Sequence, residues 1–201
     1  MKLFLIGGRP CSGKTTLSFK LGRKHNINVD CLDVFAQEFI NQSTEDYPNM
    51  YNWKDTNLIE MLQKEPKEQY RDYIKTYEEM LPFLLKAIDV SEKKESILEG
   101  SILLPKFVEV FKKSHVVKIC YLLTDDAFVR ERYYSRDYVQ NMLNKPKGKK
   151  ALNNLLLRDS LFSGYINDEI KNFALPKIVI HADDDVETNL KRLEAALGME
   201  E

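Results

Sequence analysis

The chain has few cysteines and no long apolar run. Cys11, Cys31 and Cys120 are widely spaced and form no CxxC or CxxH pattern, which excludes a disulfide framework and a zinc site of the usual spacing. The apolar stretch LFLI near the start is too short for the core of a signal peptide, and no run approaches the roughly 20 residues of a membrane-spanning helix. We therefore expect a soluble, cytoplasmic protein.

The sequence also lacks an excess of either charge. Its 201 residues contain 30 lysines and arginines against 31 aspartates and glutamates. Such a chain has no general attraction for nucleic acid or for an acidic membrane surface, so we expect neither as a partner. An anionic ligand would have to be held by local charge, and the expected partner is a small molecule. The composition leaves the oligomeric state open.

Five short apolar runs alternate with amphipathic stretches. This alternation is typical of an α/β fold in which helices cover both faces of a parallel sheet. The length of the chain suits one domain spanning residues 1–201. The runs that predict strands are LFLIG (3–7), INVDC (27–31), SILEG (96–100), VVKICYLL (116–123) and KIVIHA (177–182).

Two stretches are longer or more basic than a simple connection between strands. Residues 41–92 include tyrosines and leucines at helical spacing and predict a helical insert. We expect this insert to lie beside the small-molecule ligand, which we call the acceptor. Residues 136–155 predict a lid, within which NKPKGKKALNN (144–154) has four lysines, a proline and a glycine. That composition favours a mobile basic flap, followed by a long helix from near Leu155.

The segment GRPCSGKT follows the first apolar run directly. In Gly8-x-x-x-x-Gly13-Lys14-Thr15 the glycines allow a tight turn whose backbone N–H groups converge on phosphate oxygens. The next residues have a helical pattern, so a helix N-terminus adds its dipole to the anion site. The motif predicts an ATP site with Mg²⁺, in which Lys14 reaches the terminal phosphates and Thr15 ligates the metal. The expected nucleotide-binding residues are Gly8, Cys11, Ser12, Gly13, Lys14, Thr15 and Thr16.

With these motifs the chain resembles the P-loop kinases of the adenylate, shikimate and gluconate kinase class. The likeness covers most of the chain, and the segment ILEGSILLP (97–105) is in addition similar to the EG-x-x-L-x-P segment of 2-phosphoglycerate kinase-like proteins. The resemblance implies a three-layer α/β/α P-loop NTPase fold with ATP and Mg²⁺ as cofactors. It also implies a backbone contact with adenine at HADDDVETNL (181–190), where we expect no chemistry from His181.

Acidic residues lie where the second and third strands should end. Asp30 and Asp33 are in VDCLD, at the sheet edge where ligands of open α/β folds bind. Shikimate-kinase-like enzymes carry D-x-D there for the acceptor hydroxyl and the metal, and the Asp-x-x-Asp spacing departs from that pattern. Both residues are candidates to bind and activate the acceptor, and Asp33 could instead cap the next helix. Glu99 is a candidate ligand for the metal or the acceptor, with a buried salt bridge as the alternative.

Arginines after the fourth strand fit the lid of this class. Arg132 and Arg136 are four residues apart on one helical face, where the class keeps arginines that neutralise the transferring phosphoryl group. Solvated charges on an exposed helix are the alternative. Arg130 is better explained by an ion pair with Asp126, four residues earlier.

Two further arginines are candidates for the site. Arg158 lies on the apolar arc of the helix predicted after the flap, and a charge there is either paired in the core or aimed into a site. The resemblance implies that Arg158 is the second lid arginine, with Asp159 or Glu169 as its positioning partner. Arg71 is the one arginine of the 41–92 insert and a candidate for acceptor binding.

The favoured function is transfer of the γ-phosphoryl group of Mg·ATP to a hydroxyl of a small metabolite. Lys14 and the lid arginines would spread the charge of the transition state, while Asp30 or Asp33 orients or deprotonates the acceptor. A nucleoside monophosphate acceptor is the alternative, with less support because the insert has a single arginine. A switch or a non-catalytic nucleotide binder is also open, although the N/T-K-x-D stretch of common guanine switches and an LSGGQ-like signature are missing.

Overall fold

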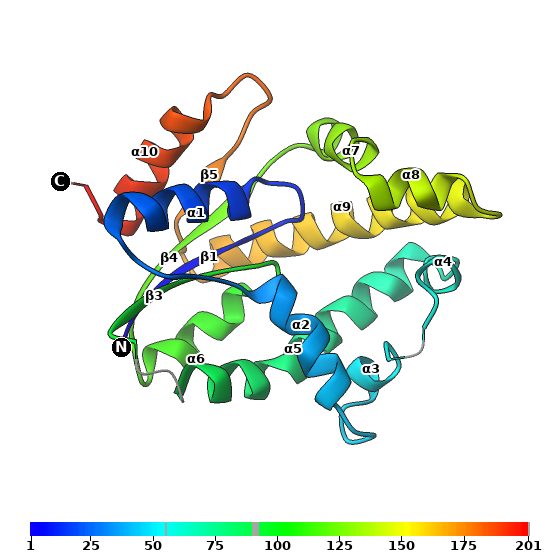
Figure 1. Cartoon of the computed structure of the whole chain (residues 1–201), viewed down its shortest axis with the longest axis horizontal. Coiled ribbons are helices and arrows are strands. Elements are labelled where there is room, and N and C mark those ends of the chain that lie inside the picture. Colours follow the sequence, from blue (N-terminus) through cyan, green and yellow to red (C-terminus); the bar gives the residue numbers. More distant parts are fainter. Residues whose placement is uncertain (55, 90–92, 201) are drawn as a thin grey trace.

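A five-stranded parallel sheet forms the centre of the computed structural model, which describes residues 1–54, 56–89 and 93–200 (Figure 1). The strand order is β2-β3-β1-β4-β5, as expected for a three-layer α/β/α P-loop NTPase. Each predicted apolar run overlaps one strand, and the edge strands β2 and β5 are shorter than their runs. The strands are β1 (Lys2–Gly8), β2 (Val29–Cys31), β3 (Glu95–Glu99), β4 (Val116–Leu123) and β5 (Lys177–Val179).

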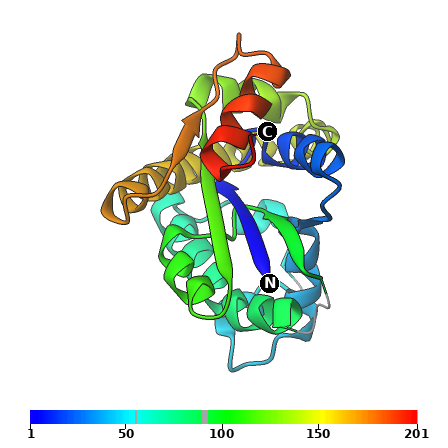
Figure 2. The same ribbon diagram turned by 90° about the vertical axis from the view of Figure 1, so that its left-hand side faces the viewer.

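The helices of the described residues cover both faces of this sheet. They are α1 (Lys14–His25), α2 (Leu32–Gln42), α3 (Pro48–Tyr51), α4 (Leu58–Met61), α5 (Pro66–Asp89), η1 (Pro105–Phe107), α6 (Val108–Lys112), α7 (Asp126–Tyr134), α8 (Asp137–Leu143), α9 (Gly148–Asn172) and α10 (Val186–Leu197). Helices α1 and α10 lie against one face, and α2, α5, α6 and α9 against the other (Figures 1 and 2).

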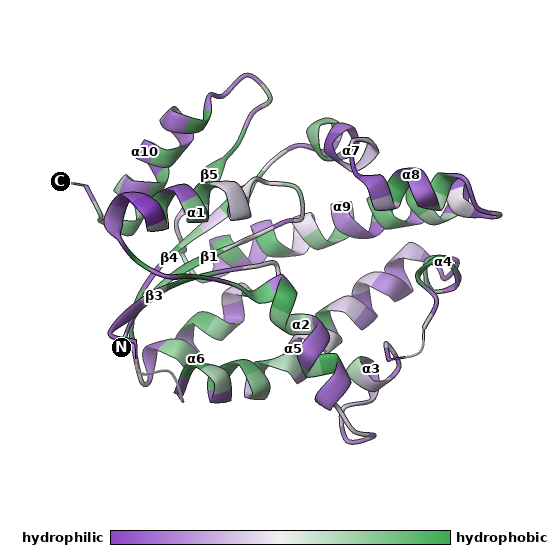
Figure 3. Cartoon of the chain, in the orientation of Figure 1, coloured by the Kyte–Doolittle hydropathy of each residue, from purple (hydrophilic) through white to green (hydrophobic). Residues whose placement is uncertain are grey.

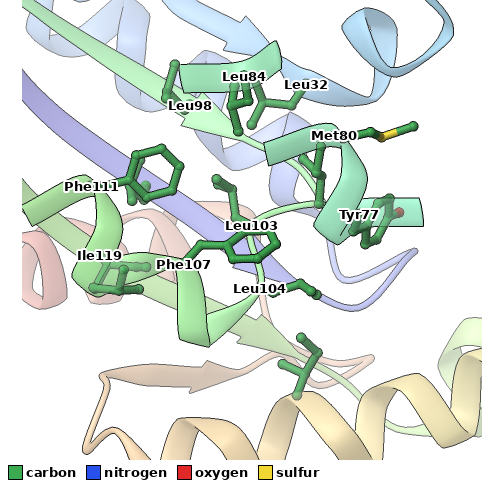
Figure 4. Packing of buried hydrophobic residues seen from close by; sticks show 14 of the residues in the cluster. Leu32, Tyr77, Met80, Leu84, Leu98, Leu103, Leu104, Phe107, Phe111 and Ile119 are labelled. Carbon is green, nitrogen blue, oxygen red and sulfur yellow. The ribbon is translucent and has the colours of Figure 1, made fainter. Parts of the chain in front are cut away.

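Alternation along the central strand β1 builds the two halves of the core. Phe4 and Ile6 belong to the cluster under α1 and α10, whereas Leu3 and Leu5 belong to the larger cluster under α2, α5 and α9. Successive side chains of a strand point to opposite faces, so a fully buried strand reads as a continuous apolar run. Figure 4 shows part of the larger cluster, with residues such as Met80, Phe107 and Phe111 lying between the helices and the sheet.

The helices carry their apolar residues on one side. In Figure 3, hydrophobic and hydrophilic residues alternate along α5, α9 and α10, as expected for helices with one buried face. The predicted insert over residues 41–92 is helical in the part that the structure describes, from the end of α2 through α3 and α4 to α5. No helix of the described residues is long and apolar enough to span a bilayer.

The prediction of a mobile flap over residues 144–154 is wrong. Helix α9 begins at Gly148, seven residues before the expected start, and the buried side chains of Ala151 and Leu152 belong to the cluster of α7 and α8. A Cβ atom on Gly148 would lie 1.9 Å from the Met142 carbonyl oxygen, so this glycine serves close packing of α9 on α8. The apolar stripe of α9 begins inside this basic stretch, where the lysines conceal it in the sequence pattern.

Candidate functional site

The loop between β1 and α1 has the backbone of a phosphate cradle. Cys11 (φ 64°) and Gly13 (φ 85°) adopt left-handed conformations, which turn successive peptide groups so that their N–H groups can face one point. Gly8 (φ 126°) lies so close to β4 that a Cβ atom would be 2.1 Å from the Leu122 carbonyl oxygen. Gly13 is the N-cap of α1, so the helix dipole is directed at the same point.

Lys14 is buried at the base of this cradle. Its Nζ donates a hydrogen bond to the Arg9 carbonyl oxygen at 2.8 Å, and burial lowers the pKa of its ammonium group. Ser12 donates from Oγ to the same carbonyl oxygen at 2.9 Å. The Lys14 ammonium group is therefore held in place by a hydrogen bond within the phosphate loop.

Glu99 and Thr15 form the candidate metal site. Glu99 is completely buried, and its Oε1 accepts a hydrogen bond from the Thr15 hydroxyl at 2.9 Å. Its Oε2 has no hydrogen-bond partner, and Glu99 forms no ion pair, within the described part of the chain. The alternative of a buried salt bridge is therefore wrong. Burial and the neighbouring Glu99 raise the pKa of the Cys31 thiol to about 11, so Cys31 stays protonated.

These oxygen donors fit Mg²⁺, which binds through one or two carboxylates and completes its shell with phosphate and water oxygens. The spare oxygen of Glu99 is the observation that supports the fit. Among the described residues no group of three or more His, Cys, Asp or Glu could hold a metal by itself. A metal here would therefore depend on the nucleotide phosphates for its other ligands.

Beside the cradle is a cavity of about 360 Å³, which we call the reaction cavity. Segments far apart in the sequence meet around it: the cradle, the first turn of α2, the middle of α5 and the region from α7 to α9 (Figure 1). Its polar lining includes Lys14, Thr15, Asp33, Tyr73, Thr76, Tyr77, Ser101, Arg132, Tyr133, Arg136 and Arg158, and its apolar lining includes Ala36, Ile40, Trp53 and Met80.

Asp33 is an acidic residue of this cavity, and Asp30 is not. Asp33 is the second residue of α2, whose N-cap is Cys31, so the capping alternative is wrong. Asp30 lies opposite Leu98 in the sheet and faces a different small cavity under α2 and α5. There it accepts hydrogen bonds from Lys93 Nζ at 2.8 Å and from Ser96 Oγ at 2.6 Å. Of the two aspartates predicted as candidates, Asp33 therefore remains, and the candidate role of Asp30 at the acceptor is wrong.

Arg132 and Arg136 both line the reaction cavity, but they do not share a helical face, which corrects the prediction. Helix α7 ends at Tyr134, and Arg136 has the extended backbone of the residue that precedes α8. The Arg132 guanidinium stacks on the Phe128 ring at 4.3 Å from its centroid. The turn between α7 and α8 thus brings the two cations to one cavity from different elements.

Arg158 is held by buried partners. Its Nε and Nη2 atoms donate to Asp159 Oδ1 at 2.9 and 2.6 Å, and its guanidinium lies 4.4 Å from the centre of the Tyr73 ring. Asp159 Oδ2 accepts from the Tyr133 hydroxyl at 2.5 Å. Asp159 is therefore the positioning partner. Glu169 bonds to Asn172 near the end of α9, so the expectation for Glu169 is wrong.

Two other arginines behave differently from expectation. Arg71 is exposed on α5 and does not line the reaction cavity, which contradicts its predicted role at the acceptor. Asp126, the expected partner of Arg130, instead bonds to Arg9 Nη2 at 2.7 Å and to Ser160 Oγ at 2.8 Å. Arg9 also donates to the Thr124 carbonyl oxygen at 2.8 Å. A buried arginine of the cradle is thus tied to the residue after β4 and to the first residue of α7, and through Asp126 to α9.

Helix α5 contributes a wall of the cavity that its sequence pattern does not predict. The helical spacing of Tyr73, Tyr77 and Met80 predicts an apolar helix face, and these residues do pack there, but they also line the cavity. The hydroxyl groups of Tyr73 and Tyr77 are hydrogen bonded to each other. A signal was present, because tyrosines on a buried face need polar partners for their hydroxyl groups.

A smaller hollow of about 110 Å³ adjoins the cradle on its other side. It lies between Phe128 and Arg132 of α7 and the residues after β5, with Gly13 and Thr16 at its base. The backbone N–H of His181 donates to Asp184 at 2.9 Å, which fixes the loop. The segment predicted to contact adenine is therefore next to the cradle.

Comparison with known proteins shows that this chain is similar to solved structures in its fold. No family model matches the chain, and no curated protein sequence matches it. A gluconokinase from Sinorhizobium meliloti is similar at a TM-score of 0.55 and 10% identity, covering 98% of this chain and 91% of the other. Deoxyadenosine kinase from M. mycoides with bound dATP has a TM-score of 0.51 and 15% sequence identity, and the match covers 98% of each chain. An uncharacterized protein from Eubacterium ventriosum has a TM-score of 0.51 and 15% identity, and the match covers all of both chains. The chain thus has the fold of P-loop small-molecule and nucleotide kinases.

Proposed function

We propose that this protein is a phosphotransferase that moves the γ-phosphoryl group of ATP to a hydroxyl group of a small acceptor. One observation carries the proposal: Asp33 lines the same cavity as Lys14, Arg132, Arg136 and Arg158. A carboxylate can orient or deprotonate a hydroxyl group, and clustered cations can neutralise a phosphoryl group in transfer. The similar folds of a gluconokinase and a deoxyadenosine kinase support the same class of reaction.

The nucleotide would occupy the cradle and the hollow beyond it. Phosphates would accept hydrogen bonds from the loop around Gly13, with Lys14 turning from the Arg9 carbonyl oxygen to the terminal phosphates. The adenine ring of ATP would lie between Phe128 and the loop after β5. Thr15 and Glu99 would hold Mg²⁺, which when bound offsets the negative charge of the phosphates.

The acceptor would lie in the reaction cavity, between Asp33 and the arginines. Asp33 is exposed to the cavity and carries no helix-capping duty, so its oxygens are available to a hydroxyl group. Trp53, Ile40 and Met80 give the same cavity an apolar side that would exclude water from the reacting groups. Arg132 lines both the cavity and the hollow, so it would stand between donor and acceptor.

The proposal is tested by removing the cation of the cradle. We expect Lys14→Ala and the volume-matched Lys14→Met to lower ATP-dependent product formation by about 10²-fold or more, because a preorganised charge at the phosphates is lost. A coupled ADP-release screen over hydroxylated metabolites, nucleosides, nucleoside monophosphates and phosphoglycerates would find the acceptor. The matched control is Lys20→Ala, an exposed lysine of the same helix.

Circular dichroism should give the same fold for all three variants. Unchanged turnover in both Lys14 variants would contradict the proposal. Tight ATP binding without turnover on any acceptor would instead favour a nucleotide-dependent switch or a non-catalytic binder.

A further inference from the structure

A second cavity adjoins the reaction cavity and is not used by the proposed reaction. Its volume is about 420 Å³, and it lies among α3, α4 and the first turns of α5; we call it the annex. Trp53 and Arg158 line both cavities, so the two are neighbours separated by these side chains. The annex is further lined by Asn49, Asn52, Thr56, Met61, Lys64, Glu68, Gln69 and Asp72.

Gln69 is the most informative residue of the annex. It is buried to 5% exposure, and its Nε2 donates to the Leu62 and Lys64 carbonyl oxygens at 3.2 and 2.7 Å. Carbonyl oxygens only accept, so the amide nitrogen must face them and the orientation of the side chain is fixed. The Oε1 atom has no hydrogen-bond partner among the described residues. A buried acceptor without a donor is unfavourable, and a small shift of the side chain that opened Oε1 to the annex would let a donor from a ligand or water stabilise it.

The charges around the annex favour the same kind of ligand. Asp72 is paired with Lys64 at 3.0 Å, and Arg158 is paired with Asp159 at 2.6 Å. Glu68 has no ion pair in the described chain, which leaves the lining with one uncompensated negative charge. An anionic group would be repelled by Glu68 and would find Gln69 offering an acceptor. A neutral or cationic group with N–H or O–H donors would satisfy both.

We propose that the acceptor is an elongated molecule that extends from the reaction cavity past Trp53 and Arg158 into the annex, and that its far end carries hydrogen-bond donors such as an amino group. The inference rests on the proposed function for the hydroxyl end at Asp33. It adds that the opposite end of the acceptor, beside Gln69 and Glu68, carries hydrogen-bond donors. Acceptors with a phosphate or carboxylate at that end are disfavoured.

The test uses the fluorescence of Trp53, the single tryptophan of the chain, which lies in the wall shared by the two cavities. The probes are matched pairs in which an amino donor is replaced by a carbonyl oxygen, which only accepts: cytidine and uridine, and adenosine and inosine. With ADP present, we expect at least one amino-bearing probe to bind at least tenfold more tightly than its partner. Gln69→Leu and the exposed variant Glu68→Gln should each remove most of that preference.

Matched controls are Gln63→Leu and Glu60→Gln, which lie on or beside α4 but do not line the annex. Both should keep the preference. The inference is overturned if no amino-bearing probe binds, if the oxygen-bearing partners bind equally well, or if Glu68→Gln and Gln69→Leu leave the preference unchanged. Because the titration needs no turnover, its failure is distinct from failure of the Lys14 test, which addresses the proposed function itself.

Discussion

Asp33 illustrates how much depends on the direction of a single side chain. It lies two residues beyond β2 and lines the reaction cavity. Burial lowers the pKa of Lys14, and the nearby charge of Asp33 partly offsets that lowering. Asp30 is three residues earlier and is bound to Lys93 and Ser96 on the face of the sheet under α2. Two similar residues therefore belong to different parts of the molecule.

This difference predicts opposite results for the two amide variants. Asp33→Asn should lower kcat by about 10²-fold or more, the usual contribution of a general base, with little change in stability. Asp30→Asn should keep kcat within about twofold and lower the free energy of unfolding by about 1 kcal/mol, since it weakens a half-buried ion pair. Steady-state kinetics and urea unfolding measure the two effects. Equal losses of kcat would show that the acceptor is not activated at Asp33.

At the scale of elements, the site is built where α9 passes between α5 and α7. Arg158 and Asp159 of α9 contact Tyr73 of α5 and Tyr133 of α7. Ser160, on the same helix, bonds to Asp126, which in turn bonds to Arg9 of the cradle. One helix thus connects α5, α7 and the phosphate loop, so a shift of α9 would be transmitted to all three.

The Arg158–Asp159 pair allows its structural and catalytic roles to be separated. Arg158→Ala should lower the free energy of unfolding by about 3–5 kcal/mol, because it leaves Asp159 buried without its partner. The double variant Arg158→Met/Asp159→Leu should recover part of that stability, since no uncompensated charge is left and the remaining loss is the acceptor of the Tyr133 hydroxyl. Its turnover should stay about 10²-fold down if Arg158 acts on the phosphoryl group. Thermal unfolding and kcat are measured together, and recovery of both would assign Arg158 a structural role alone.

At the scale of the whole molecule, the two ends of the chain are joined on one face of the sheet. Glu194 of α10 is buried and bonds to Lys24 and His25 of α1 at 2.9 and 2.7 Å. Burial raises the pKa of Glu194, but these hydrogen bonds outweigh it and lower the pKa below the ordinary 4.5. The contact is therefore strongest when Glu194 is ionised.

This shift predicts how stability depends on pH. A carboxylate with a lowered pKa in the folded state stabilises the fold above pH about 4.5, and the contribution is lost as the pH falls through the folded-state pKa. Glu194→Gln should cost about 1–2 kcal/mol at pH 7 and flatten the loss of stability on acidification. Glu187→Gln is the control, because Glu187 joins the same helices through an exposed pair with Lys20. Equal acid dependence of Glu194→Gln and the unmodified protein would contradict the assignment.

The five strands and the phosphate cradle could be predicted from the sequence because their signals are local. A buried parallel strand reads as an apolar run, and the cradle depends on glycines at fixed spacing next to a strand. The start of α9 could not be predicted, because four lysines hid the residues that pack on Met142. The wall of α5 was missed for a related reason, since Tyr73 and Tyr77 serve the core and the cavity at once.

By itself, the sequence determined the phosphate cradle and its surroundings: the order of strands and helices along the chain, the loop around Gly13 and Lys14, and the carboxylate of Glu99 at the end of β3. Only the tertiary structure decided the composition of the reaction cavity. It directed Asp30 away from the cavity, brought Arg136 and Arg158 into it, and enclosed the annex around Gln69. The physical reason is the separation along the chain over which each interaction acts. Turn geometry and helix N-termini act within a few residues, whereas a cavity is shaped by side chains from segments that meet only when the sheet and its helices pack together.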